Sequence, residues 1–380
     1  MMSKICAICS TLLNETNNTK EHVIPNGIGG RKKVRDFICR RCNNESGANW
    51  DSELCEQLDH FSLLFQIERE RGFPSKQIFK TVDGNEIRVL PDGSMEHTKP
   101  TFNIEEHDEG AKIHISARNK KEARQIVSGQ AKSISKKYPN ASPLDIDEIQ
   151  FKEKRGYLES PLQITKSYGG LSVGRSLVKS ALALVAESGI DVTHCEHAIS
   201  FLRDVEGSTP CFGFYYDQND LVIDRPIGVP FHCVHVEGGD QDKLIKGYVE
   251  YFGHIRYVLL LSSNYSGSSF NASYSINPLT GETMELDIKI PLTESGFLDC
   301  YHFKRYDTEI LNTALGSIMS TLIARDIKRQ KEKEIRLAYD YALNKMGITS
   351  DDELTTEDYK LFINHLTDHL LPFLISLHRR

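Results

Sequence analysis

Four cysteines near the start of the chain are spaced as two pairs, Cys6-x2-Cys9 and Cys39-x2-Cys42. A two-residue gap allows both sulfur atoms of a pair to reach one ion, and two such pairs supply the four thiolates of a closed tetrahedral zinc site. The chain has nine cysteines, and the other five are scattered and expected to be core residues: Cys55, Cys195, Cys211, Cys233 and Cys300. We therefore expect one structural zinc ion between the two pairs.

The segment between the two pairs is longer than the gap of a zinc ribbon and contains further residues that could do chemistry. In chain order these are Glu21-His22, Pro25, Gly29-Gly30 and, directly after the second pair, Asn43. Hydrolysis of a phosphodiester needs a nucleophilic water and a stabilised leaving oxygen. One neutral imidazole and one divalent cation can divide that work.

The stretch of residues 6–51 resembles the zinc-stapled HNH, or ββα-metal, endonucleases. The signature of that family is two CxxC pairs that enclose Glu-His, a proline and Gly-Gly, with Asn directly after the second pair and a glycine and an aspartate further on. The matching residues here are Cys6, Cys9, Glu21, His22, Pro25, Gly29, Gly30, Cys39, Cys42, Asn43, Gly47 and Asp51. The resemblance covers roughly the first sixth of the chain.

The resemblance implies roles for three of these residues. His22 would be the general base that takes a proton from the attacking water, and Glu21 and Asn43 would hold a catalytic Mg²⁺ or Mn²⁺ ion at the scissile phosphate. Neighbouring residues of a strand point to opposite sides, so Glu21 and His22 cannot both face that ion directly. The zinc ion would be separate and structural, because four thiolates leave no open position for substrate.

A basic segment lies next to these residues. Between Gly30 and Cys42 only Asp36 opposes six basic residues, which are Arg31, Lys32, Lys33, Arg35, Arg40 and Arg41. Residues 1–49 contain eight Lys/Arg and four Asp/Glu, a local charge of +4, whereas the whole chain has a net charge of −7. We expect the six basic residues to contact DNA phosphates without reading the sequence, while the acidic remainder discourages indiscriminate binding.

The elements that must position these residues follow a hairpin-then-helix order. Short strands are expected at residues 21–24 and 34–38, joined by the glycine-bearing loop. A helix should begin near Cys42 and continue to about Phe65, because Leu54, Leu58 and Phe61 recur at helical spacing. A unit of this size needs the zinc ion to hold the hairpin against the helix.

The rest of the chain predicts a larger mixed body, and the whole is assigned to the α+β class with C-terminal helices. A hairpin is expected at residues 77–81 and 87–90, and helices are expected to begin near residues 119, 171, 307 and 355. Further strands are expected at residues 211–216, 231–236 and 255–261 and around 277–281. The domain boundaries that we expect are residues 1–65, 70–170 and 171–380.

The sequence argues against membrane insertion, secretion and further metal sites. No stretch approaches 18 uninterrupted apolar residues and the first residues lack the apolar core of a secretory signal, so a cytoplasmic protein without membrane contact is expected. Two histidine groups could suggest further metal sites, but each lacks obvious additional ligands: His194 with His197, and His232-Cys233-His235. His365 and His369 are expected on a solvated helix face.

The leading hypothesis is a metal-dependent DNA endonuclease, either a restriction enzyme or an anti-phage defence effector. One imidazole and one catalytic ion cut one strand per head, so nicks are expected unless the protein forms a homodimer. A first alternative is an HNH effector whose body binds a nucleotide signal and works with defence-system partner proteins. A second alternative is a zinc-stabilised DNA-binding protein without catalysis.

Overall fold

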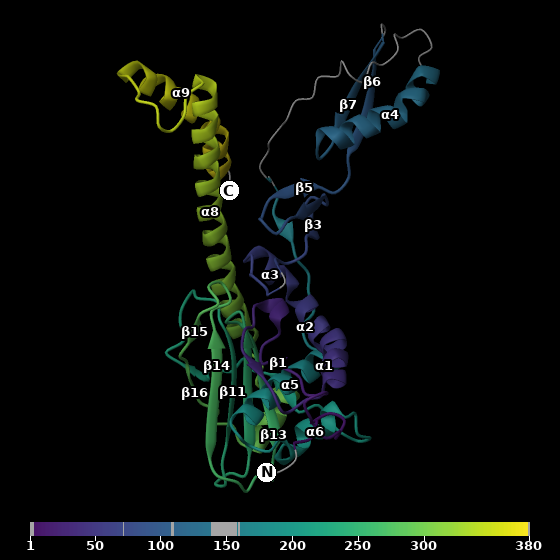
Figure 1. The fold of residues 1–380 in the computed structure, drawn as a ribbon, viewed down its shortest axis with the longest axis vertical. Coiled ribbons are helices and arrows are strands. Elements are labelled where there is room, and N and C mark those ends of the chain that lie inside the picture. Colours follow the sequence, from purple (N-terminus) through teal and green to yellow (C-terminus); the bar gives the residue numbers. More distant parts are fainter. Residues whose placement is uncertain (1–3, 71, 108–109, 138–157, 159, 379–380) are drawn as a thin grey trace. The chain divides into compact units, whose positions relative to one another are not determined.

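The structure is a computed structural model that describes residues 4–378 except residues 71, 108–109, 138–157 and 159 (Figure 1). The chain divides into two compact units, residues 1–75 with 166–326 and residues 76–165 with 327–380. Both units combine helices and strands, so the expected α+β class is confirmed. Each unit is described by itself below.

The N-terminal part of the first unit is a small hairpin followed by helices. Strands β1 and β2 pair antiparallel, with Glu21 opposite Val34 and His22 opposite Lys33. The elements of this part are β1 (Glu21–His22), η1 (Asn26–Ile28), β2 (Lys33–Val34), α1 (Arg40–Ser46), η2 (Gly47–Asp51), α2 (Ser52–Gln57) and α3 (Asp59–Leu64). The hairpin-then-helix order expected from the sequence is therefore present.

The helical segment is broken twice rather than continuous as expected. A π-helical turn, η2, follows α1, and Leu58 with φ −105° and ψ 2° separates α2 from α3. Wide turns of this kind often occur at functional sites because they redirect a side chain without ending the helix. Here η2 directs Asp51 toward Ser176, whose hydroxyl donates a 2.6 Å hydrogen bond to Asp51 Oδ1.

A six-stranded antiparallel sheet forms the centre of the first unit, in the order β15-β14-β11-β12-β13-β9. One face of the sheet is covered by the helices α5 and α6, and the other by α7 and the short β10/β16 pair. Both faces are covered, which explains why every residue of β12 and β13 is buried. The bounds are β9 (Phe212–Phe214), β10 (Val222–Ile223), β11 (His232–Gly238), β12 (Ile245–Tyr251), β13 (Ile255–Ser262), β14 (Phe270–Ile276), β15 (Thr283–Met284), β16 (Asp287–Ile288), η3 (Val192–His194), α6 (Glu196–Leu202) and α7 (Glu294–Tyr301).

Helix α5 (Leu171–Glu187) joins the sheet to the N-terminal part. It packs on β11, β12 and β14 and also on β1, β2, η2 and α2. Twelve of its 17 residues are buried, because the helix packs both on the sheet and on the N-terminal part. The helix expected at residue 171 is thus confirmed, and it serves as the shared core of the first unit.

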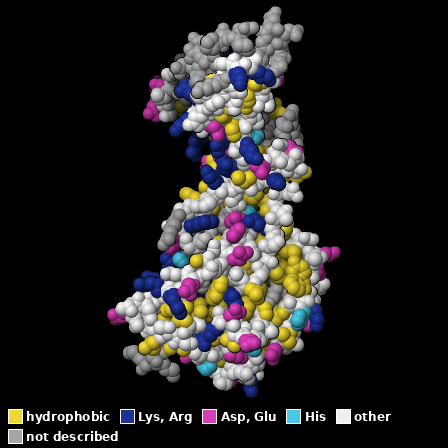
Figure 2. Space-filling view, turned by 90° about the vertical axis from the view of Figure 1, so that its right-hand side faces the viewer, with side chains coloured by type: hydrophobic (Ala, Val, Ile, Leu, Met, Phe, Trp, Pro, Cys, Tyr) yellow, Lys and Arg dark blue, Asp and Glu magenta, His cyan; other side chains and the backbone are white. Residues whose placement is uncertain are grey.

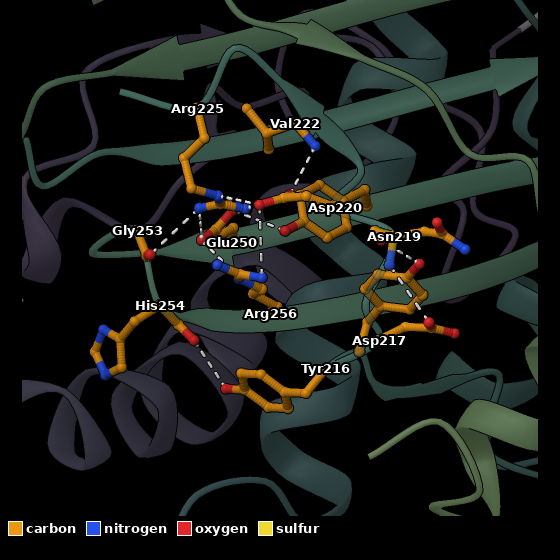
Figure 3. A network of polar contacts seen from close by, with 12 residues as sticks. Tyr216, Asp217, Asn219, Asp220, Val222, Arg225, Glu250, Gly253, His254 and Arg256 are labelled. Atoms are coloured by element: carbon orange, nitrogen blue, oxygen red, sulfur yellow. Dashed lines mark hydrogen bonds and ion pairs between the residues drawn. The ribbon is translucent and has the colours of Figure 1, made fainter. Parts of the chain in front are cut away.

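The sequence does not predict strand β12, because charged residues and a glycine interrupt its apolar pattern. Lys246, Gly247 and Glu250 interrupt its apolar residues, yet Glu250 is fully buried. Figure 3 shows how the sheet accommodates this charge: Arg225 Nη1 lies 2.6 Å from Glu250 Oε1, and the same guanidinium contacts Asp220. The Tyr248 hydroxyl also donates to Glu250 at 2.7 Å. A fully satisfied network of this kind fixes the strand register.

The second unit contains a four-stranded sheet, a separate hairpin and helices. The sheet order is β5-β4-β3-β8, and β6 pairs with β7. The bounds are β3 (Gln77–Thr81), β4 (Glu86–Val89), β5 (Met95–His97), β6 (Thr101–His107), β7 (Gly110–Ser116), α4 (Lys120–Lys137), β8 (Leu162–Gln163), α8 (Thr308–Met346, which begins in the first unit) and α9 (Thr356–His378). Among the described residues, no helix combines the length and the apolar character that crossing a bilayer requires.

The close approach of two backbone segments at Gly30 gives a test of the hairpin. A Cβ atom at this position would lie 1.7 Å from the carbonyl oxygen of Ile24, so Gly30→Ala must displace the loop that closes β1 and β2. We expect a loss of about 2 to 4 kcal/mol in the free energy of unfolding, measured by urea titration. Gly47→Ala is the control, because a Cβ there meets nothing within 4 Å. It should be neutral or stabilising, and equal urea midpoints for the two variants would contradict the packing described.

Candidate active site

The four N-terminal cysteines come together at one point. Their sulfur atoms all lie within 4.8 Å of one another, and Cys9 Sγ is 3.7 Å from Cys39 Sγ. A Zn–S bond of about 2.3 Å in a tetrahedron places two sulfurs about 3.8 Å apart, so the cluster has the dimensions of a zinc site. The Ala7 amide donates to the Phe37 carbonyl at 2.8 Å and thereby holds the first pair beside the second.

The cysteine cluster is suited to a structural metal. Cys6, Cys39 and Cys42 are buried, and the second pair stands at the start of α1. Thiolates occupy all four positions, so a bound zinc ion would have no open coordination site. The ion would therefore fix the N-terminal loop to α1, which is the role expected from the spacing of the cysteines.

Glu21 and His22 point to opposite sides of β1, as the strand alternation predicts. The Glu21 side chain is buried and the His22 side chain is 23 % exposed. His22 Nε2 lies 3.4 Å from Glu70 Oε1, and Lys33 Nζ lies 2.8 Å from Glu70 Oε2. Burial lowers the pKa of His22, and the opposing effect of Glu70 is smaller. The lowered pKa favours the neutral imidazole that a general base requires.

Glu21 meets a lysine of α5. The buried Lys179 ammonium donates to the carboxylates of both Glu21 and Asp51. Burial alone would lower the pKa of Lys179, but the two carboxylates outweigh it and raise that pKa. Burial raises the pKa of Glu21, and the nearby ammonium opposes this shift.

Asn43 of α1 lies beside the backbone that leads into β1. Its Nδ2 donates to the Lys20 carbonyl at 3.1 Å and to the Thr19 hydroxyl at 3.3 Å. The amide therefore ties the start of α1 to the chain that enters β1. This contact places Asn43 beside the backbone that precedes Glu21 and His22.

Comparison with known proteins agrees with this arrangement. Residues 6–59 match the family model described as HNH endonuclease. These residues form an HNH endonuclease domain. No curated protein and no solved structure matches the chain. The match covers the cysteine cluster, the hairpin and the first helices.

The basic residues predicted to bind DNA divide into two groups in the HNH domain. Three of them face acids: Arg31 with Glu68 at 3.7 Å, Lys32 with Glu187 at 2.8 Å and Lys33 with Glu70 at 2.8 Å. The other three are exposed, namely Arg35, Arg40 and Arg41. The first unit is the lower part of Figure 2. On the face shown there, basic and acidic side chains are interspersed rather than gathered in one basic patch.

The histidine groups of the body have protein partners. His232 Nε2 contacts the Ile28 carbonyl at 2.8 Å, and His235 Nδ1 contacts the Ser273 hydroxyl at 2.6 Å. His197 Nε2 lies 2.9 Å from the Ser263 hydroxyl. Within the part of the chain that the structure describes, the cysteine cluster is the one group of three or more histidine, cysteine or acidic residues with the spacing of a metal site.

Two residues of the site were missed by the sequence analysis. Glu70 follows the HNH motif, and no local pattern connects it with His22. Lys179 left no clear signal, because its spacing from Ser172, Arg175 and Ser176 places it on the polar side of α5. Only the packing of α5 on the N-terminal part shows that this side of the helix is buried as well.

The cysteine cluster predicts the metal content of the protein. We expect one zinc ion per chain by atomic emission spectroscopy, lost in Cys42→Ala together with a fall in Tm of about 10 °C or more, because metal binding and folding are coupled. Cys300→Ala is the control, since Cys300 lies in the core of the body away from the cluster, and it should keep its zinc. Full zinc content in Cys42→Ala would contradict the assignment.

Proposed function

We propose that this protein is an HNH endonuclease that hydrolyses phosphodiester bonds in DNA with His22 as its general base. The observation that carries the proposal is the position of His22 in the HNH domain: its imidazole lies on the partly exposed side of β1, where solvent and a phosphate can reach it. Glu70 and Lys33 border the same side. The HNH family match supports the reaction class.

The step performed by the protein itself is a proton transfer. The neutral His22 imidazole accepts a proton from a water as that water attacks phosphorus, and the bond from phosphorus to the leaving oxygen breaks. Glu70, which is within 3.4 Å of the imidazole, would stabilise the imidazolium that results. The positive charges of Lys33 and the exposed arginines would stabilise the negative charge of the substrate.

The family resemblance also implies a Mg²⁺ or Mn²⁺ ion held by Glu21 and Asn43. The Glu21 carboxylate is bonded to Lys179 inside the protein, and the Asn43 amide is bonded to the backbone of Lys20. As they stand, these two groups do not fit the ion. We therefore derive no step through the ion.

The biological setting that we propose is restriction or anti-phage defence, by analogy with free-standing bacterial HNH proteins that carry large bodies. One imidazole in each chain cuts one strand in each encounter. The expected primary product is therefore nicked DNA, and double-strand breaks require two copies of the chain or two encounters.

The assignment of His22 predicts the outcome of a plasmid assay. Supercoiled plasmid incubated with the protein and Mg²⁺ or Mn²⁺ should become nicked, and His22→Ala should lower the rate by at least about 100-fold because the general base is lost. His114→Ala is the control, since that histidine is exposed on β7 in the second unit. DNA binding by His22→Ala should stay within about twofold of the wild type. Equal nicking by His22→Ala and the wild type would exclude His22 as the base.

The division of the basic residues predicts a change in salt dependence. The triple variant Arg35→Ala/Arg40→Ala/Arg41→Ala should reduce the magnitude of the negative slope of log affinity against log salt by about 2 to 3, because each phosphate contact contributes about 0.9. Fluorescence anisotropy with a labelled duplex measures this slope. A triple variant of three highly exposed lysines is the control and should keep the wild-type slope: Lys99→Ala/Lys289→Ala/Lys304→Ala. A larger change of the slope in the lysine variant than in the arginine variant would contradict the proposed DNA-contacting surface.

A further inference from the structure

Lys179, which lies outside the HNH match, contacts two acidic residues of the HNH domain. Lys179 is 1 % exposed, and its ammonium donates to Glu21 of β1 and Asp51 of η2. Ser176, one turn earlier on α5, donates to the other oxygen of Asp51 at 2.6 Å. Three charged groups from three elements thus meet in the interior of the first unit.

The Lys179 side chain is enclosed by the core of the first unit. It stands in the middle of α5, and the buried residues of that helix extend from Val173 to Val185 on both sides of it. The same helix packs on the strands β11, β12 and β14. A rotation of the side chain away from Glu21 and Asp51 would leave a buried charge without its partners, and this is costly in the interior.

The ammonium and a divalent ion are rivals for Glu21. Two cations that share one carboxylate repel each other, and this repulsion is strong where water is excluded. Removing the ammonium instead would leave the buried Glu21 carboxylate and the partly buried Asp51 carboxylate without a counter-charge, which is the costly way to break such an ion pair. The arrangement that satisfies all three groups is the one in which Lys179 stays.

We infer that Lys179 is a positioning residue of the nuclease, and that its ammonium is the cation to which Glu21 is bound. Glu21 then anchors β1 from the inside and thereby orients the adjacent His22 on the outside, rather than holding a divalent ion. The inference rests on the proposed function, since it assigns the orientation of His22 to this anchor. It also makes α5 part of the nuclease unit, beyond the residues that match the family.

A double-mutant cycle in stability tests the inference in the full-length protein. Lys179→Met should lower Tm by about 10 °C, because it leaves the buried Glu21 carboxylate and the partly buried Asp51 carboxylate without a counter-charge. Glu21→Gln should lower Tm by no more than about 3 °C, since Lys179 and Asp51 remain paired and the amide oxygen can still accept. The double variant Glu21→Gln/Lys179→Met should melt above Lys179→Met, because one uncompensated carboxylate has been removed.

Lys166→Met provides the matched control. Lys166 also joins the segment before α5 to the N-terminal helices, through Asp59 of α3 at 2.8 Å, but both side chains are about one quarter exposed. Its effect on Tm should be small and should add to that of Glu21→Gln. If the effects of Glu21→Gln and Lys179→Met also add, so that their double variant has the lowest Tm, the inference is overturned.

A second measurement decides the matter even if Lys179→Met does not fold. Titration with Mn²⁺, followed by electron paramagnetic resonance, compares the wild type with Glu21→Gln. Affinities within twofold of each other, or no binding in either protein, support the inference, whereas a tenfold or larger weakening in Glu21→Gln identifies Glu21 as a ligand and overturns it. Failure of the proposed function is distinguishable, because undiminished nicking by His22→Ala would reject the function without changing the stability cycle.

Discussion

A single buried ammonium, that of Lys179, is the point on which the first unit of this protein depends. It satisfies Glu21 and Asp51, which belong to the hairpin and to the π-helical turn of the HNH domain. The Glu21 carboxylate could not be buried alone, because an unpaired charge in the interior costs several kcal/mol. The helix that carries the lysine is in turn held by the central sheet. The nuclease domain and the body therefore share one core, and the body supplies a residue that the domain requires.

The cysteine cluster and Lys179 restrain the hairpin from two directions. The cluster fixes the N-terminal loop to the start of α1, so that Asn43 can bond to the chain entering β1. The ammonium fixes the inner side of β1 through Glu21. His22 is left on the other side with Glu70 and Lys33. A general base needs this combination, because it must be rigid and yet remain open to water and substrate.

The sequence was informative wherever the relevant signal was local. The spacing of the cysteines predicted the cluster, the period of the apolar residues predicted α5, and the family motif placed Glu21 and His22 on a hairpin ahead of a helix. Contacts between distant segments could not be predicted in this way. Nothing near Glu21 indicates a partner 158 residues away, and β12 was missed because the buried Glu250 is compensated by Arg225. The roles of His22, Glu21 and Asn43 stay predictions.

The most direct test of this account is a crystal structure of the full-length protein grown with Mn²⁺, with anomalous maps that separate zinc from manganese. The account predicts a zinc peak among the four cysteine sulfurs, the Lys179 ammonium within hydrogen-bond distance of Glu21, and no manganese on that carboxylate. A manganese peak bound to Glu21, with the lysine displaced, would contradict the central claim.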